Sequence, residues 1–393
     1  MNEGRLLFLS NGHGEDIVGA KIAQELMGIA PYIDVIAMPV VGEGKAYEAI
    51  GVKIVGPRLI MPSGGLIWRR PLALLRDIQV GLLSVARDQI RILKALSSDV
   101  DLVVGVGDKV ILFLNAWFTK KPMVFVGLAD SKYYAGTRRV YTNPERKIMR
   151  KWCKGVFVRD EPTAQDLNDN GVAARYVGNP MMDTFDITGE DFGMGSKETI
   201  IGILPGSRGD AYENARFILK VVYSLSQKAC DAIGFLLALA PTLSIYELAD
   251  HLTVDGWRLS EVKPGLWSFQ LSPAQVLVTG DLFGDVLATS HMVIGLTGTA
   301  NEQAAGLGKP VITFPGMGQQ INARFVMGQK KLLGDAVLVV EGNEESVTNA
   351  VFQLITQQEQ YNFMSQAGRA RMGDSGGSRR IAHEIEAILK GEG

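Results

Sequence analysis

MVIGLTGTANEQAAGLGKPVITFPGMGQQIN, residues 292–322, is the stretch that decides the fold class of this chain. It opens with an apolar run at 292–296, which has the length and branched side chains of a buried strand. A small-residue turn follows, and residues 301–307 predict a helix that Gly308 and Pro310 terminate. The apolar run at 311–314 predicts a second buried strand. The order strand, helix, strand predicts an α/β unit with parallel strands.

The turn between this first strand and its helix is a candidate binding site. It contains Thr297, Gly298 and Thr299, and Glu302 follows in the first turn of the helix. A tight turn at a helix N-terminus leaves free backbone N–H groups, where a diphosphate can dock. The Glu302 carboxylate could accept hydrogen bonds from a ribose diol. The alternative is an ordinary βαβ unit with a cap and a glycine stop.

Length and composition indicate a globular chain of two domains. The 393 residues exceed one ordinary core, and 47% are hydrophobic against 21% charged. A net charge of −2 gives no global attraction to nucleic acid or to an anionic membrane, and it leaves room for a local basic patch. The two cysteines fit a reducing compartment, and the sequence lacks a Cys/His cluster for structural zinc. The first residues do not resemble a signal peptide, and the longest uncharged stretches are too short to span a bilayer.

The N-terminal strand, residues 5–10, leads into a second glycine-rich turn. Its glycines do not match the dinucleotide fingerprint, because the third falls at Gly19 and position 17 is Ile17. We therefore expect no nicotinamide cofactor. His13, in this turn, is a candidate substrate contact or general base. The alternative is a loop histidine hydrogen-bonded to backbone.

Asp108 is the polar end of another apolar strand, expected over residues 101–108. Ligands of open α/β sheets collect at the carboxyl ends of strands, so Asp108 is placed to deprotonate a substrate hydroxyl as general base. The alternative is an N-cap for a helix expected over residues 110–117.

Apolar residues and arginines alternate in the segment 57–71, which its prolines and glycines exclude from regular helix. Trp68, Arg69 and Arg70 suit contact with a membrane interface or a lipid-linked acceptor. The alternative is a loop that packs on the core with solvated arginines. A long amphipathic helix is expected over 72–96. Further along the chain, tyrosines 133–134 and arginines 138–139 stand in a loop that could line a cleft.

The α/β pattern starts again after a polar segment at 184–197, which we interpret as an interdomain linker. The strand 199–204 leads into a turn with Gly206, Ser207 and Arg208, and a helix over 210–227 follows. An arginine in such a turn is suited to clamp a diphosphate, although it can also be merely solvated. The expected domains are residues 1–185 and 199–375, joined by a linker at 186–198. A C-terminal helix at 376–393 can pack back on the first domain.

These motifs carry a resemblance to known families. TGTANEQAAGLGKPVITF resembles the donor-binding segment of glycosyltransferases of the two-domain B fold. LPGSR at 204–208, YVGNPMMD at 176–183 and the element beginning Gly14-Glu15-Asp16 resemble lipid-A-disaccharide synthase. Gln319, Gln320 and Asn322 are similar to the donor loop of the peptidoglycan N-acetylglucosaminyltransferase.

The resemblance implies an α/β fold of two Rossmann-like domains facing a central cleft. It implies Asp108 as base, residues 206–208 and 297–299 at the diphosphate, and Glu302 at the ribose. Gly14 and Glu15 fall on the acceptor side. The chain departs from the pattern at SNGHGED, which lacks the family's serine, and at GNP in place of GHP. These departures imply a different acceptor.

The expected activity is an inverting, metal-independent glycosyl transfer without a cofactor, from a nucleotide-diphosphate sugar, with UDP as the expected nucleotide, to a hydroxyl of a lipid or lipid-linked acceptor. The expected location is the cytoplasm, with peripheral contact at the inner face of the membrane. Two alternatives stay open. One is a nucleotide-sugar 2-epimerase of the same fold, and the other is a non-catalytic nucleotide-sugar-binding protein.

Overall fold

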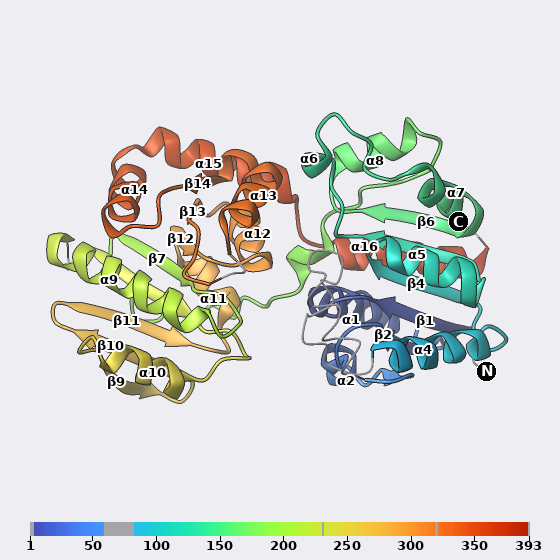
Figure 1. Ribbon diagram of the computed structural model, residues 1–393, viewed down its shortest axis with the longest axis horizontal. Coiled ribbons are helices and arrows are strands. Elements are labelled where there is room, and N and C mark those ends of the chain that lie inside the picture. The colour runs from blue at the N-terminus through green and yellow to red at the C-terminus, as the bar shows by residue number, and fades with distance from the viewer. Residues whose placement is uncertain (1–3, 59–81, 230–231, 319–320, 392–393) are drawn as a thin grey trace. The chain divides into compact units, whose positions relative to one another are not determined.

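The computed structural model describes residues 4–58, 82–229, 232–318 and 321–391 (Figure 1). The chain forms two compact α/β units. Unit 1 comprises Met1–Thr184 and Asp374–Gly393, and unit 2 comprises Phe185–Gly373. The C-terminal segment therefore belongs to the same unit as the N-terminus.

Unit 1 is built on a parallel sheet of the described strands in the order β3-β2-β1-β4-β5-β6. These strands are β1 (Arg5–Ser10), β2 (Asp34–Pro39), β3 (Lys53–Ile54), β4 (Leu102–Gly107), β5 (Met123–Gly127) and β6 (Cys153–Val158). Successive residues of β1 point into two different apolar cores. Leu6 and Phe8 belong to one core, and Leu7 and Leu9 belong to the other. The sheet is therefore covered by apolar packing on both faces, as a parallel sheet requires.

The helices of unit 1 lie on the two faces of this sheet (Figure 1). They are α1 (His13–Ile29), α2 (Lys45–Ala49), α4 (Leu82–Leu96), α5 (Lys109–Leu114), α6 (Lys132–Ala135), α7 (Asn143–Trp152), α8 (Glu161–Asn168) and α16 (Gly377–Lys390), with a π-helical turn η2 (Asn115–Thr119) and a 3-10 turn η3 (Pro180–Asp183).

Helix α16 completes the core of unit 1. Its residues Ile381 and Ile385 are fully buried in the cluster that contains Phe8. The Asp183 carboxylate caps its N-terminus by accepting from the backbone N–H groups of Gly376 and, at 2.7 Å, Ser378. A carboxylate at this position satisfies N–H groups that the helix itself leaves unpaired.

Unit 2 contains a larger mixed sheet, in the order β14-β13-β12-β7-β8-β11-β10-β9. Its strands are β7 (Thr199–Leu204), β8 (Ile233–Ala238), β9 (Arg258–Lys263), β10 (Leu266–Leu271), β11 (Ala274–Thr279), β12 (Met292–Gly295), β13 (Val311–Thr313) and β14 (Val337–Val339). Strands β9, β10 and β11 form antiparallel pairs, and the other pairs are parallel.

The helices of unit 2 follow its strands in α/β alternation. They are α9 (Ala211–Ala229), α10 (Ile245–Thr253), α11 (Phe283–Thr289), α12 (Thr299–Gly306), α13 (Ala323–Leu333), α14 (Glu344–Thr356) and α15 (Gln358–Met372), with a 3-10 turn η4 (Gly334–Ala336). The expected α/β class, with parallel strands at the centre of both sheets, is confirmed.

Residues 174–177, which the sequence favours as a strand, do not form one, since only Arg175 makes a bridge, with Phe157. The Val177 carbonyl accepts instead from Arg380 Nε of helix α16. The helix expected over 110–117 begins at Lys109 and changes to the π-helical turn η2 at Asn115, whose Nδ2 donates to the carbonyl of Lys121 at 2.9 Å.

The segment expected as a linker, residues 186–198, lies within unit 2. The buried carboxylate of Asp285 accepts from the N–H groups of Thr188 and Gly189, each at 2.8 Å, and of Glu190 at 3.2 Å. Phe192 is buried as well. These contacts fix the segment on its unit.

Candidate functional site

The strand order of unit 2 has a switch point between β7 and β12. From β7 the chain continues to β8 on one side, and from β12 it continues to β13 on the other. At such a point the loops after the two strands diverge, and ligands of open α/β sheets bind there. The predicted donor residues of the turns 206–208 and 297–299 occupy these two loops.

The loop after β7 is shaped by Gly206. Its φ of +120° lies in the region that favours glycine, and a Cβ there would stand 3.2 Å from the Leu296 carbonyl oxygen. The missing side chain therefore lets this loop lie directly against the loop after β12. Ser207 and Arg208 are exposed at the tip, and Thr242 Oγ1 donates to the Ser207 carbonyl at 2.6 Å.

The loop after β12 is held by two buried amides that the sequence analysis did not select. Asn301 Nδ2 donates to the Gly295 carbonyl at 3.1 Å and to Gln329 Oε1 at 2.9 Å. Gln329 Nε2 donates in turn to the Gly298 carbonyl at 2.9 Å. Glu302, in the first turn of α12, is only 8% exposed. The sequence signal that could have identified this network is an amide side chain within a predicted helix, as at Asn301.

The third element at this edge is the loop 315–318, which Asn214 of helix α9 ties to the turn after β7. Asn214 Nδ2 donates to the Pro205 carbonyl at 3.0 Å, and its Oδ1 accepts from the Met317 N–H at 2.9 Å. Asn322 is the N-cap of α13 and accepts from the Phe325 N–H at 3.0 Å. Gln319 and Gln320, also predicted at the donor, lie outside the described residues.

Unit 1 has its own switch point, between β1 and β4. Asn11, after β1, and Asp108, after β4, meet there. Asn11 Nδ2 donates to Asp108 Oδ1 at 2.6 Å, and the Asp108 N–H donates to Asn11 Oδ1 at 3.2 Å. Asp108 is also the N-cap of α5 and accepts from the Val110 N–H at 2.8 Å. The alternative role of Asp108 as a cap is thus present, and the same contacts fix its carboxylate at the sheet edge.

His13 is the first residue of α1, at the same edge. Its ring lies against Gly42, where a Cβ would be 2.9 Å from His13 Cε1 and 3.7 Å from Asp16 Oδ2. Gly42 has a φ of +96°, so glycine is required there both for the backbone and for the ring. The side chains of His13 and Asp16 therefore both lie beside the backbone of Gly42, in the loop after β2.

Asp16 is a buried acid that the sequence analysis did not select. It is 3% exposed and accepts from Ser10 Oγ at 2.6 Å, and Tyr47 Oη donates to Ser10 Oγ at 3.1 Å. Burial raises the pKa of Asp16 to about 7, against the lowering effect of the Ser10 hydrogen bond and with a small addition from the charge of Glu15. In sequence, an acid in the first turn of a helix is indistinguishable from an exposed residue that favours the helix dipole.

Two further predicted residues of unit 1, Gly14 and Glu15, lie in the first turn of α1. The Glu15 side chain packs beside Gly12 and Gly107, where Cβ atoms would come within 2.2 Å and 3.3 Å of it. Trp68, Arg69 and Arg70 lie outside the described residues. Within the described ranges, no group of three His, Cys, Asp or Glu side chains is arranged to hold a metal ion.

Comparison with known proteins places the chain near two groups of enzymes. No protein-family model matches it. It is 25% identical over 242 residues to lipid-A-disaccharide synthase of Trichlorobacter lovleyi, covering 56% of this chain and 58% of that protein. The same enzyme of Syntrophotalea carbinolica is 25% identical over 241 residues, 56% of this chain and 57% of that one. The chain thus matches somewhat more than half the length of these relatives. The resemblance found in the motifs is confirmed as a similarity.

Solved structures match nearly the whole chain. Staphylococcus aureus MnaA with UDP has a TM-score of 0.61 at 16% identity, covering 98% of this chain and 97% of that one. The calicheamicin glycosyltransferase CalG4 has a TM-score of 0.60 at 15% sequence identity, and the match covers 99% of this chain and 99% of that one. The UDP-GlcNAc 2-epimerase of Neisseria meningitidis, bound to UDP-GlcNAc, has a TM-score of 0.57 at 16% sequence identity. The match covers 98% of this chain and 100% of that one. The expected class, two Rossmann-like domains of the glycosyltransferase B type, is confirmed.

Proposed function

We propose that this protein is a glycosyltransferase that moves a sugar from a nucleotide-diphosphate sugar, with UDP as the expected nucleotide, to a hydroxyl of a lipid or lipid-linked acceptor. The observation that carries the proposal is the switch point of unit 2. The loop after β7 approaches the loop after β12 at Gly206, helices α9 and α12 begin beside these loops, and Arg208 is exposed in the first loop. Free N–H groups and a guanidinium are the groups that bind a diphosphate.

The relatives support both halves of this proposal. Structures of the same fold hold UDP or UDP-GlcNAc, which supports the nucleotide. The curated relatives are named lipid-A-disaccharide synthase, which supports a lipid acceptor. The matched segment covers only part of those relatives, so the acceptor of this chain is proposed by chemical class.

In the proposed reaction the acceptor oxygen attacks the anomeric carbon from the face opposite the diphosphate. A new C–O bond forms, the bond to the diphosphate oxygen breaks with its electron pair leaving on that oxygen, and the configuration inverts. The acceptor proton passes to the Asp108 carboxylate. Arg208 and the N–H groups of residues 298–299 stabilise the charge on the departing diphosphate without requiring a metal, and Glu302 orients the ribose.

An exposed aromatic patch on unit 1 supports contact with lipid. Trp117 is 61% exposed and stacks on Phe113 at 5.0 Å between ring centroids, and Lys94 Nζ lies 5.7 Å from the ring centre of Phe118. Lys120 is exposed next to it. Tryptophan flanked by lysines suits the interface between acyl chains and anionic headgroups. In the described part of the chain, none of the helices combines the length and apolarity needed to cross a membrane. We propose peripheral contact at the cytoplasmic face.

The test is to incubate the purified protein with a panel of nucleotide sugars, with and without a total lipid extract. Nucleoside diphosphate release and the sugar itself are both measured. Release that depends on lipid is the expected result.

Two other outcomes contradict the transferase. Isomerised nucleotide sugar without lipid identifies a 2-epimerase, a function that the similar fold of the Neisseria enzyme keeps as second candidate. Binding of the nucleotide sugar without any product, across all lipid extracts tested, identifies a non-catalytic binding protein.

A further inference from the structure

Two strands of unit 2 begin beside each other at the sheet edge opposite the turns 206–208 and 297–299. His291 stands immediately before β12, and Lys309 stands two residues before β13. The two strands pair in parallel, so both strand starts lie at one edge. The candidate donor turns follow the carboxyl ends of β7 and β12, at the other edge. The amino edge of β12 and β13 is therefore a surface separate from the candidate donor site.

One face of helix α15 covers this amino edge. Tyr361, Ser365 and Arg369 are spaced by four residues, so they lie on the same face of the helix. Tyr361 Oη donates to the His291 carbonyl at 3.0 Å. A Cβ at Gly308 would stand 2.5 Å from Arg369 Nε and 2.7 Å from Ser365 Oγ, so the glycine lets α15 lie directly on the turn before β13. We name four of the residues that meet here the amino-edge cluster: His291, Lys309, Ser365 and Arg369.

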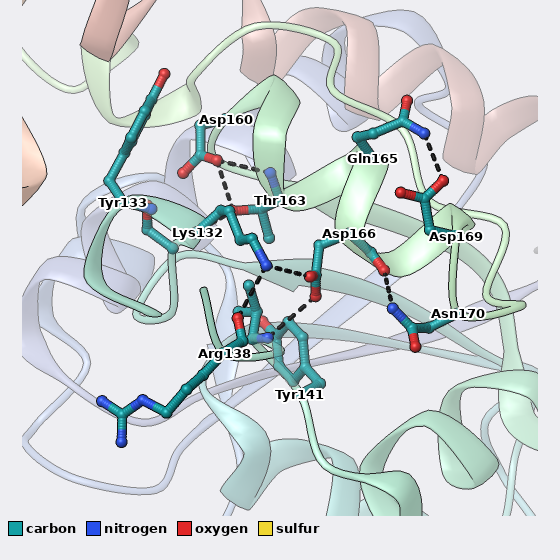
Figure 2. A network of polar contacts seen from close by, with 12 residues as sticks. Lys132, Tyr133, Arg138, Tyr141, Asp160, Thr163, Gln165, Asp166, Asp169 and Asn170 are labelled. Atoms are coloured by element: carbon teal, nitrogen blue, oxygen red, sulfur yellow. Dashed lines mark hydrogen bonds and ion pairs between the residues drawn. The ribbon is translucent and has the colours of Figure 1, made fainter. Parts of the chain in front are cut away.

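Lys309 is a half-buried cation without an acid partner. Its Nζ donates to the Ala288 carbonyl in the last turn of α11 at 2.8 Å, which uses one of three N–H donors. The ion pairs among the described residues of unit 2 do not include it. Lys132, drawn in Figure 2, has the usual arrangement of a partly buried lysine, because its Nζ donates to the buried Asp166 carboxylate at 2.5 Å. Lys309 lacks such a counter-charge.

The other basic groups of the amino-edge cluster increase this imbalance. Arg369 is exposed, and it too is absent from the ion pairs of the described part of unit 2. Burial lowers the pKa of Lys309, and the charge of Arg369 lowers it further. Burial also lowers the pKa of His291, and the charge of Lys309 adds to this effect. The positive charges are therefore close enough to repel one another, and a bound anion would relieve the repulsion.

The cluster also offers neutral hydrogen-bond donors. His291 Nδ1 accepts from the Ile200 N–H at 3.0 Å, so the neutral ring carries its proton on Nε2. Ser365 contributes a hydroxyl beside Gly308. An ammonium, a guanidinium, an imidazole N–H and a hydroxyl are thus gathered at one sheet edge, and all four can donate to oxygen.

We propose that the amino-edge cluster binds a phosphate group, with Lys309 and Arg369 as charged ligands and the neutral donors beside them. A phosphate dianion matches two cations, whereas a carboxylate would neutralise only one. A guanidinium binds phosphate oxygens through paired N–H donors, and a lysine ammonium binds them as a point charge. The inference is independent of the proposed transferase, since it concerns the edge of the sheet away from the candidate donor turns.

The first experiment titrates the full-length protein with inorganic phosphate at constant pH and ionic strength. The chain has four histidines, so the ring signal of His291 can be followed by NMR and assigned with His291→Gln. We expect phosphate to shift this signal and to leave that of His383, an exposed histidine of unit 1, unchanged. Lys309→Met and Arg369→Met should each weaken phosphate binding about tenfold. Lys331→Met, which removes an exposed lysine of α13, is the matched control and should retain it.

Three results overturn the proposal. They are an unshifted His291 signal at every phosphate concentration reached, an equal loss of affinity in Lys331→Met, and a loss that follows Arg208→Met while Lys309→Met and Arg369→Met bind normally. The last result would place the phosphate at the turn after β7. Lys309→Met also removes the bond to the Ala288 carbonyl, so its melting temperature is recorded. Arg369→Met replaces an exposed side chain, and it decides the question if Lys309→Met unfolds.

A second arm separates free phosphate from the phosphate of a membrane lipid. Co-sedimentation with phosphatidylcholine vesicles, with and without phosphatidic acid, is measured for the wild type and for Arg369→Met. A phosphate-induced shift of His291 together with weaker binding of Arg369→Met to acidic vesicles supports a lipid headgroup as the ligand. The same shift with unchanged vesicle binding supports a free phosphate compound. Weaker vesicle binding without any shift of His291 shows a general attraction to membrane charge, and the phosphate site is then wrong.

Discussion

Asn11 and Asp108 are 97 residues apart in the chain and exchange two hydrogen bonds at the carboxyl ends of β1 and β4, at 2.6 Å and 3.2 Å. This pair closes the switch point of unit 1. The observed N-cap role of Asp108 and its proposed role as general base can be separated by experiment, since the N-cap needs only an acceptor oxygen and a general base needs a carboxylate.

Asp108→Asn is expected to lower turnover about 100-fold or more, because general bases contribute roughly that much. Asparagine is as good an N-cap as aspartate, and its oxygen can still accept from Asn11 and Val110. The melting temperature and the dissociation constant for the nucleotide should therefore change little. The measurement is nucleoside diphosphate release with lipid, beside nucleotide binding. Full turnover in this variant would place the base elsewhere.

Asp16 predicts a pH-dependent stability. Its pKa in the folded protein, about 7, is raised above the ordinary 3.8, so the neutral acid is favoured by folding. This contribution is fully present below about pH 4 and is lost as the pH rises through about 7. Relative to Asp16→Asn, the wild-type unit should lose on the order of 2–4 kcal/mol between about pH 4 and pH 8.

The measurement for Asp16 is hydrogen exchange of the β1 amides in both proteins at several pH values. Asparagine at position 16 can accept from Ser10 but carries no charge, so its stability should show no such slope. If the stability of the two proteins changes with pH in the same way, Asp16 is ionised over the whole pH range measured.

Arg208→Met is expected to weaken UDP binding about tenfold, because a charge-assisted hydrogen bond to the diphosphate is lost. Arg208→Lys should keep part of the affinity, since the charge remains without the paired donors. Arg258→Met, an exposed arginine of β9 in the same unit, is the control. Calorimetric titration with UDP gives the result, and an equal effect of both methionine variants would argue against a specific clamp.

Trp117→Ala is expected to lower the fraction of protein bound to vesicles that contain an anionic lipid, because the indole ring is the largest exposed group of the aromatic patch. The ring lies on the surface, so folding should be unaffected. Tyr246→Ala, an exposed aromatic residue of unit 2, is the control. Co-sedimentation with vesicles checks this prediction, and unchanged binding would remove the patch as the lipid contact.

Asp183→Ala is expected to destabilise helix α16 by about 1–2 kcal/mol, because the N–H groups of Gly376 and Ser378 lose their acceptor. Asp183→Asn should cost less, since an acceptor oxygen remains. Hydrogen exchange of the α16 amides measures the effect. Protection equal to wild type in the alanine variant would show that water replaces the carboxylate at no cost.

The sequence predicts those features that depend on local pattern. The apolar runs at 5–10, 101–107, 199–204 and 292–296 correspond to β1, β4, β7 and β12, because a strand buried on both faces must be apolar throughout. The turns after three of them hold predicted residues. Asp108 follows β4 in the sheet of unit 1, whereas Arg208 and Thr297 follow the neighbouring parallel strands β7 and β12 in the sheet of unit 2.

Features set by distant residues could not be read from the pattern. Strand β9 is mostly exposed and polar, so no apolar run marks it, and its hairpin partner β10 defines it. Asp16 differs from Glu15 through its buried surroundings, in which Ser10 donates to its carboxylate and Tyr47 donates to Ser10. The amides Asn301 and Gln329 are 28 residues apart, and their pairing appears only when α12 and α13 pack.

The cap that Asp183 places on α16 has a consequence for biosynthesis. Part of the core that contains Phe8 is completed by Ile381 and Ile385, which the ribosome adds only after all of unit 2. Domains usually fold in the order in which they emerge. We therefore expect an apolar flank of the unit 1 sheet to stay uncovered until helix α16 is synthesised, and transiently exposed apolar surface of this kind is what chaperones protect.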